Sequence, residues 1–329
     1  MSKKVVVLST GGTIASTPAA DGRNISGALA GEALVEKIEM KSDIQVEVSS
    51  VFQKPSNAIT AQDLMVLHDT CRQLMAQGDV SGIVITHGTD TMEDTAYFLE
   101  STLNTCDCPV VLTGSQRVPH AMGTDAYVNL RNAILVAASS KVHGLGVLLV
   151  FNETLYSANF VRKVSAFQLN GFDAPGYGFL GLIDNGEVTV YQTPQQMPLL
   201  PAAELPPVDI LPAYLGARPA LVDVAVAAGA RGLVLEGVGR GHVPPDWMPA
   251  IRNACDQGIL VAVCSSTLHG PVYQTYEFTG SLHDLECAGA IGVSGLSARK
   301  LRLRLGLLIA QQKTDRASVL AACQWQART

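Results

Sequence analysis

Residues 5–13 read Val-Val-Val-Leu-Ser-Thr-Gly-Gly-Thr, four apolar residues followed within three positions by a pair of glycines. A short run that is apolar on both faces is typical of a buried strand in a parallel sheet. Comparable runs occur at residues 82–86, 109–113 and 145–151. Helical patterns separate these runs, so the order strand, turn, helix predicts an α/β fold with a parallel sheet.

The expected helices are marked by start signals. Thr60 and Asp63 have the spacing of a capping box, and apolar residues follow at helical intervals. Thr91 and Asp94 have the same spacing and predict a second capped helix. A third helix is expected over about residues 125–138.

A proline-rich stretch divides the chain. Residues 192–212 hold six prolines, and because proline cannot continue a helix or a central strand, we expect an extended linker there. We therefore expect a first domain over residues 1–191 and a second over residues 213–329. Apolar runs at residues 232–236 and 259–264, with a helical pattern between them, predict that the second domain is a smaller α/β unit.

The composition narrows the class of function. The 329 residues are 47% hydrophobic and 16% charged, with a formal net charge of −6, which favours folded domains over disorder. No segment is dense in lysine and arginine, so we expect no nucleic-acid partner. No apolar run approaches the roughly 18 residues of a membrane helix, and none resembles a signal peptide, so we expect a cytoplasmic protein without a membrane partner. The seven scattered cysteines complete no metal-ligand spacing, so we expect no metal.

The first motif that could carry chemistry is Ser-Thr-Gly-Gly-Thr-Ile-Ala at residues 9–15, directly after the first expected strand. Ligands bind beyond the carboxyl ends of parallel strands, and glycines allow the sharp turn that would present the Thr13 hydroxyl. An ordinary strand-to-loop turn is the alternative. A phosphate cradle or a dinucleotide-binding oxidoreductase is disfavoured, because Gly11 and Gly12 do not supply the required glycine fingerprint.

The second motif, Thr-His-Gly-Thr-Asp-Thr-Met-Glu-Asp-Thr at residues 86–95, also follows an expected strand and opens a helix. Thr89 and Asp90 would face the same ligand crevice. We interpret His87 as a hydrogen-bonding core residue rather than a general base. A threonine hydroxyl needs a group that takes its proton, and Lys163 is the candidate, with a solvated surface lysine as the alternative.

Together these motifs resemble a known family. Residues 10–15 look like the first signature of bacterial-type L-asparaginases, and residues 87–95 look like the second, in the same order and at a similar separation. The resemblance extends over essentially the whole chain. It implies a larger N-terminal domain with a Rossmann-like or flavodoxin-like parallel sheet and a smaller C-terminal α/β domain. It also implies hydrolysis of asparagine to aspartate and ammonia, with glutamine as a poorer substrate and without a metal or organic cofactor.

The resemblance further implies roles for individual residues. Thr13 would be the nucleophile that forms an acyl-enzyme, and Thr89 would be a second catalytic threonine in a hydrogen-bonded triad with Lys163 and Asp90. Asp90 would also bind the α-ammonium of the amino-acid substrate. The other expected substrate-binding residues are Ser56 for the α-carboxylate, Asn57 near the α-ammonium, Gly88, and Ser115, whose backbone carbonyl would line the amide pocket.

Two departures from the family pattern keep alternatives open. No tyrosine occurs between Thr13 and Met40, where the family usually has a loop tyrosine, and Asn24 or a neighbour would take its place. Arg240 stands where many relatives have asparagine. A broader glutaminase-asparaginase and a non-catalytic amino-acid-binding or sensing protein are the alternatives. We expect the loop over residues 16–30 to be mobile, and the resemblance implies a homotetramer, a dimer of dimers with sites near subunit interfaces.

Overall fold

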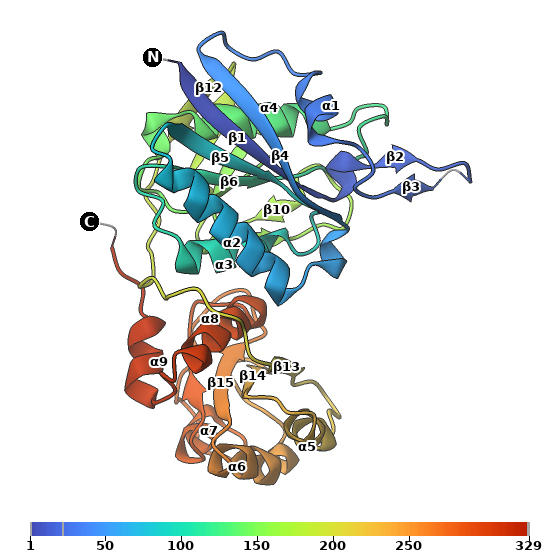
Figure 1. Ribbon diagram of the computed structural model, residues 1–329. Coiled ribbons are helices and arrows are strands. Elements are labelled where there is room, and N and C mark those ends of the chain that lie inside the picture. The colour runs from blue at the N-terminus through green and yellow to red at the C-terminus, as the bar shows by residue number, and fades with distance from the viewer. Residues whose placement is uncertain (1, 22, 328–329) are drawn as a thin grey trace. The chain divides into compact units, whose positions relative to one another are not determined.

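The opening apolar run forms an interior strand of a large sheet in the computed structural model, which describes residues 2–21 and 23–327. The chain divides into a first unit, made of the residues up to Leu199 together with Ala327, and a second unit that runs from Leu200 to Gln326. Each unit has its own sheet, flanked by helices (Figure 1). The expectation of an α/β fold with two sheet-bearing parts is confirmed.

The first unit is built on an eight-stranded sheet with the order β12-β11-β8-β7-β6-β5-β1-β4. β1 (Lys3–Gly11) pairs in parallel with both β4 (Ile44–Lys54) and β5 (Val80–Thr86). The parallel pairing continues through the next two strands, whereas the last three are antiparallel. These strands are β6 (Val110–Thr113), β7 (Leu148–Phe151), β8 (Thr154–Ser157), β11 (Gly181–Asp184) and β12 (Glu187–Val190).

Helices cover both faces of this sheet (Figure 1). α1 (Gly31–Val35) and α4 (Ala126–Ala137) pack on the face that carries Val5 and Val7. α2 (Ala61–Ala76) and α3 (Met92–Thr102) lie together on the opposite face. Because successive strand residues point to opposite faces, the continuous apolar run of β1 is what a strand covered on both sides requires.

The two expected capping boxes have different outcomes. At the start of α2, the Thr60 side chain accepts from the Asp63 backbone and the Asp63 side chain accepts from the Thr60 backbone, so that prediction is confirmed. At the start of α3, the Thr91 side chain caps nothing, so the Thr91–Asp94 box is wrong. The Thr91 hydroxyl instead donates to the Ser56 carbonyl oxygen at 2.7 Å, which ties the 3-10 turn η2 (Ser56–Ala58) to the helix.

The second unit has a four-stranded parallel sheet with the order β13-β14-β15-β16. α5, α6 and α7 pack on one face, and α8 packs against β13, β14 and β15. The longest described helix is the 16-residue α2 of the first unit, and no described helix is long and apolar enough to span a bilayer. The bounds in the second unit are β13 (Val208–Pro212), β14 (Gly232–Gly237), β15 (Leu260–Ser265), β16 (Ile291–Gly292), α5 (Ala220–Ala227), α6 (Met248–Asp256), α7 (Leu282–Cys287), α8 (Ala298–Ala310) and α9 (Arg316–Ala322).

The proline-rich stretch differs from the extended linker expected over residues 192–212. Its last five residues are β13, and the second unit begins at Leu200 rather than at residue 213. β13 is an edge strand and Pro212 is its final residue. Proline is tolerated at such a position because no interior ladder hydrogen bond depends on it. The prolines therefore exclude a central strand without excluding an edge strand.

Candidate active site

The connections of the large sheet reverse direction around β1. The chain leaves β1 to form β4 on one side of it, then returns through α2 to form β5 on the other side. In open α/β sheets, ligands bind beyond the carboxyl ends of the strands at such a reversal. At this edge the first sequence motif, residues 10–15, runs from the end of β1 into the turn after it, and the second, residues 87–95, runs from β5 into the first turn of α3.

The two loops touch through glycines. Gly12 has a φ of 82°, and a Cβ added there would lie 2.4 Å from the Gly88 backbone nitrogen. Only a residue without a side chain allows this approach. Thr13, which is partly buried and opens the 3-10 turn η1 (Thr13–Ala15), and Thr89 directly follow the touching glycines. The structure thus brings the backbones that carry the two expected catalytic threonines together.

Lys163 forms hydrogen bonds to two residues of the second motif. It lies in the two-residue strand β9 (Arg162–Lys163) and donates from Nζ to Thr89 Oγ1 at 2.7 Å and to Asp90 Oδ1 at 2.6 Å. Thr89 is 6% exposed, the Lys163 side chain 14% and the Asp90 side chain 70%. Lys163 is therefore not the solvated surface lysine of the alternative interpretation. The ammonium connects a buried hydroxyl to a carboxylate that faces solvent.

A buried carboxylate that was not predicted from the sequence holds Lys163 in register. Glu93, on the first turn of α3, accepts the Lys163 backbone N–H on Oε2 at 2.6 Å and is 2% exposed. β9 also pairs with β10 (Phe172–Asp173). A hydrogen bond to an ionised acceptor is stronger than a neutral one, so Glu93 fixes the backbone from which Lys163 reaches Thr89. The available signal was a glutamate on the buried face of the expected helix.

His87 is a satisfied core residue, as predicted. Nδ1 lies 2.7 Å from the Gly88 carbonyl oxygen and Nε2 lies 2.9 Å from Thr95 Oγ1. Because a carbonyl only accepts, Nδ1 carries the proton and Nε2 accepts from the threonine. Complete burial lowers the pKa of His87 to about 4. Both nitrogens are engaged, and within residues 2–21 and 23–327 no three His, Cys, Asp or Glu side chains are grouped to hold a metal ion.

Two expected substrate-binding residues lie in η2. Ser56 is buried against the second loop, since a Cβ added to Gly88 would lie 2.8 Å from Ser56 Oγ. Asn57 is exposed. Gly88 therefore lies between the backbone of the first loop and the Ser56 side chain, and the Thr91 hydrogen bond holds η2 in this place.

Ser115 lies in the loop after β6, also at the carboxyl edge of the sheet. It is fully buried, and its hydroxyl donates to the Arg117 carbonyl oxygen at 2.6 Å. The Asp125 carboxylate accepts the backbone N–H groups of Gln116 and Arg117, both at 2.9 Å. These bonds fix the loop and turn the Ser115 side chain onto its own segment, so the expected role of its backbone carbonyl in ligand binding stays a prediction.

The two departures from the family pattern lie in different units. Residues 16–30 include a short antiparallel hairpin of β2 (Thr17–Pro18) and β3 (Asn24–Ile25), in which Asn24 is exposed. Gly22, within this expected loop, lies outside the described residues. Arg240 belongs to the second unit, where it is exposed after β14. Burial lowers the pKa of His242, and the positive charge of Arg240 lowers it further.

Comparisons with known proteins cover both units. The family model "Asparaginase, N-terminal" matches residues 4–196, and "Glutaminase/Asparaginase C-terminal domain" matches residues 207–321. The chain is 44% identical to an L-asparaginase of Bacillus licheniformis, over 95% of this chain and 97% of that one. It is 31% identical to a probable periplasmic L-asparaginase of Haemophilus influenzae, over 94% and 89%. The crystal structure of a probable cytoplasmic L-asparaginase from Campylobacter jejuni superposes with a TM-score of 0.86 at 28% identity, covering 96% and 98%.

Proposed function

The chain belongs to the asparaginase family, and we propose that it hydrolyses the side-chain amide of L-asparagine to L-aspartate and ammonia. The observation that carries this proposal is the Lys163 ammonium, which lies within hydrogen-bond distance of both Thr89 Oγ1 and the Asp90 carboxylate. A threonine hydroxyl is inert until a neighbouring group takes its proton. This cluster supplies such a group beside the expected nucleophile loop.

Thr13 is the proposed nucleophile. Its oxygen forms a bond to the amide carbon, the carbon–nitrogen bond breaks, and ammonia leaves an acyl-enzyme behind. The backbone N–H groups of the two touching loops are assigned to the oxyanion, because fixed donors stabilise charge as it develops in the transition state. Water then attacks the acyl carbon and releases aspartate, which restores the Thr13 hydroxyl.

Thr89, Lys163 and Asp90 manage the proton in this scheme. A proton that passes from Lys163 to Asp90 Oδ1, 2.6 Å away, leaves an amine. That amine accepts the Thr89 hydroxyl proton across 2.7 Å. The hydroxyl in turn serves the reacting group, taking a proton from the attacking oxygen and giving one to the leaving nitrogen. General acid–base assistance of this kind contributes about 10²–10⁴-fold to a rate.

The substrate is a zwitterion, so its binding needs a partner for each charge. Asp90 is assigned to the α-ammonium with Asn57 nearby, and Ser56 is assigned to the α-carboxylate. The exposure of the Asp90 side chain and the burial of Ser56 beside Gly88 support this division. The Ser115 carbonyl is assigned to the amide nitrogen. Charge-assisted hydrogen bonds are the strong ones, and the α-ammonium gains one.

A wider glutaminase-asparaginase activity is the second candidate. It is favoured by the C-terminal family model, whose description names both activities. We further propose a cytoplasmic protein, supported by the name of the Campylobacter structure, and a homotetramer with sites near subunit interfaces. The mass of the native assembly in solution, measured by light scattering, tests the tetramer against a monomer of 34.7 kDa.

Ammonia release from asparagine and from glutamine, measured side by side over a wide concentration range, tests the function. Release from asparagine that is lost in Thr13→Ala and in Thr89→Val variants that remain folded is the expected result. A near-normal rate in Thr89→Val would remove Thr89 from the mechanism. Absence of release from both amides, in a folded protein that binds aspartate, would favour the amino-acid-binding protein instead.

A further inference from the structure

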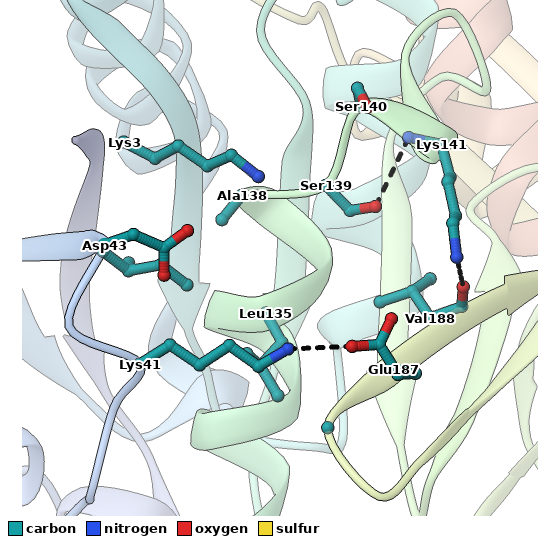
Figure 2. A pocket seen from close by; sticks show the side chains of 12 residues that line it. Lys3, Lys41, Asp43, Leu135, Ala138, Ser139, Ser140, Lys141, Glu187 and Val188 are labelled. Carbon is teal, nitrogen blue, oxygen red and sulfur yellow. Dashed lines mark hydrogen bonds and ion pairs between the residues drawn. The ribbon is translucent and has the colours of Figure 1, made fainter. Parts of the chain in front are cut away.

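A pocket of about 280 Å³ opens at the other end of the large sheet (Figure 2). It is formed at the amino-terminal ends of β1 and β4, by Lys3, Asp43 and Ile44. The candidate active site lies at the carboxyl ends of β1 and β5, so the two places are separated by the length of a strand. The pocket therefore does not belong to the chemistry proposed above.

Charged side chains from four segments meet in this pocket. Its lining includes three lysines and two carboxylates, so its charge is positive by one unit. Lys41 pairs with Glu187 at 3.0 Å across the opening. Lys141, in the 3-10 turn η3 (Ser140–Val142), donates to the Val188 carbonyl oxygen at 2.8 Å. A lysine ammonium has three donors, so Lys141 keeps donors for a ligand.

Lys3 and Asp43 bring opposite charges into the pocket. Their backbones are joined, since Lys3 donates its N–H to the Asp43 carbonyl at 2.8 Å. Within the described ranges 2–21 and 23–327, however, no hydrogen bond or ion pair engages the Lys3 ammonium or the Asp43 carboxylate. Figure 2 shows the ends of both side chains directed toward the middle of the pocket. An opposite pair held apart across a hollow has room for a ligand that carries both charges.

Local backbone charge selects the kind of ligand. α4 ends at Ala137, and Leu135 and Ala138 line the pocket, so the negative end of the helix dipole faces it. Together with Asp43 and Glu187, this end disfavours a compact polyanion such as phosphate and favours an ammonium group. Lys3 and Lys141 favour carboxylates. With Glu187 neutralised by Lys41, the pocket presents two ammonium groups and one carboxylate.

We propose that this pocket is a second binding site, for a small acidic amino acid. The two carboxylates of the ligand pair with Lys3 and Lys141, and its ammonium pairs with Asp43 beside the end of α4. The charges of the ligand match those of the pocket in number and are opposite in sign. The pocket volume is at the small end of the range for ligand sites, which suits a molecule of this size. The inference stands on the pocket alone and does not depend on the proposed function.

Isothermal titration with aspartate tests the site, carried out on an Asp90→Asn variant so that binding at the candidate active site is weakened. We expect one aspartate to bind per chain. Adding Lys3→Met or Asp43→Asn should raise the Kd about tenfold or more, since each removes a charge-assisted hydrogen bond. The pair Lys313→Met and Asp107→Asn makes the same chemical changes at exposed positions outside the pocket and should leave the Kd unchanged.

Two further probes define the ligand. Succinate has both carboxylates without the ammonium and should bind more weakly than aspartate, because Asp43 is then left unpaired. Inorganic phosphate should bind more weakly still. An unchanged Kd in Lys3→Met, an absence of aspartate binding, or tighter binding of phosphate than of aspartate would each overturn the proposal. Asparagine hydrolysis by Lys3→Met and Asp43→Asn, measured separately, reports on the proposed function alone.

Discussion

Replacement of Gly12 by alanine tests whether contact between the two glycine loops sets the geometry of the site. Gly12 has a φ of 82°, and an added Cβ would lie 2.4 Å from the Gly88 backbone nitrogen. Gly78 is a matched control. Its φ is 76°, and among the described residues an added Cβ there would meet no atom within 4 Å. Both substitutions place a side chain at positive φ, but Gly12 also has a ψ of −173°, a conformation that essentially only glycine adopts, and only its added Cβ collides with the backbone.

The magnitude follows from this difference. A side chain at an unfavourable positive φ costs about 1–3 kcal/mol of the free energy of unfolding, and the cost is larger in Gly12→Ala because its φ and ψ fall in a region essentially restricted to glycine. At Gly12 the new carbon is also about 1 Å short of an ordinary van der Waals separation, and the atoms it meets are backbone. The loop must therefore shift, and a misplacement of about 1 Å costs about 10²-fold in rate. We expect kcat/KM for asparagine to fall about 100-fold in Gly12→Ala and to stay near the parent value in Gly78→Ala.

The assay is ammonia release at several asparagine concentrations, together with urea unfolding of the parent and both variants. Urea unfolding shows whether each variant is folded under the conditions of the rate measurement. Equal kcat/KM values in the two variants would refute the reasoning, because the collision would then have no effect on the site. A rate for Gly12→Ala within threefold of the parent would refute it as well.

Three further predictions concern the groups around Thr89. Lys163→Met should lower kcat by about 10³-fold or more, and Lys163→Arg should not restore it because a guanidinium does not give up its proton. A kcat for Lys163→Arg within tenfold of the parent would show that only the positive charge is needed. Burial lowers the pKa of His87 to about 4 from 6.5, so between these values the unfolded state binds the proton and the folded state does not. Stability should fall by up to about 3 kcal/mol as the pH drops from 6.5 to 4, and His87→Gln should flatten this slope in urea unfolding at a series of pH values; parallel slopes would contradict the assignment. Glu93→Gln keeps an acceptor for the Lys163 N–H but loses its charge, so kcat should fall about fivefold with little change in KM, whereas a change confined to KM would contradict a positioning role.

The central strands could be predicted because burial on both faces leaves a continuous apolar run, as in residues 5–8 and 82–86. β4 was not anticipated, although it has eleven residues. It is an edge strand, and its first residues alternate Ile44, Gln45, Val46, Glu47, as a half-covered strand does. The period of two was the available signal. A search for continuous apolar runs therefore finds the central strands of such a sheet and misses an edge strand such as β4.

The position of the site was predictable because parallel strands bring their carboxyl ends to one edge. The partner of Thr89 was harder to find, since Lys163 lies 74 positions away on a strand of two residues. No periodic pattern marks so short a strand. Its place is fixed by the buried Glu93 carboxylate and by pairing with β10, and both are tertiary interactions. For the same reason Thr91 has the spacing of a helix cap but is used to hold η2.

The absent loop tyrosine changes what the remaining groups must do. As the proposed nucleophile, Thr13 would need an acceptor for its proton, and residues 14–39 hold no phenol that could serve. The backbone contact between Gly12 and Gly88 carries Thr13 to the same edge at which Lys163 meets Thr89 and Asp90. In the proposed mechanism, one proton relay would serve both threonines in a chain that keeps both motifs and lacks the tyrosine.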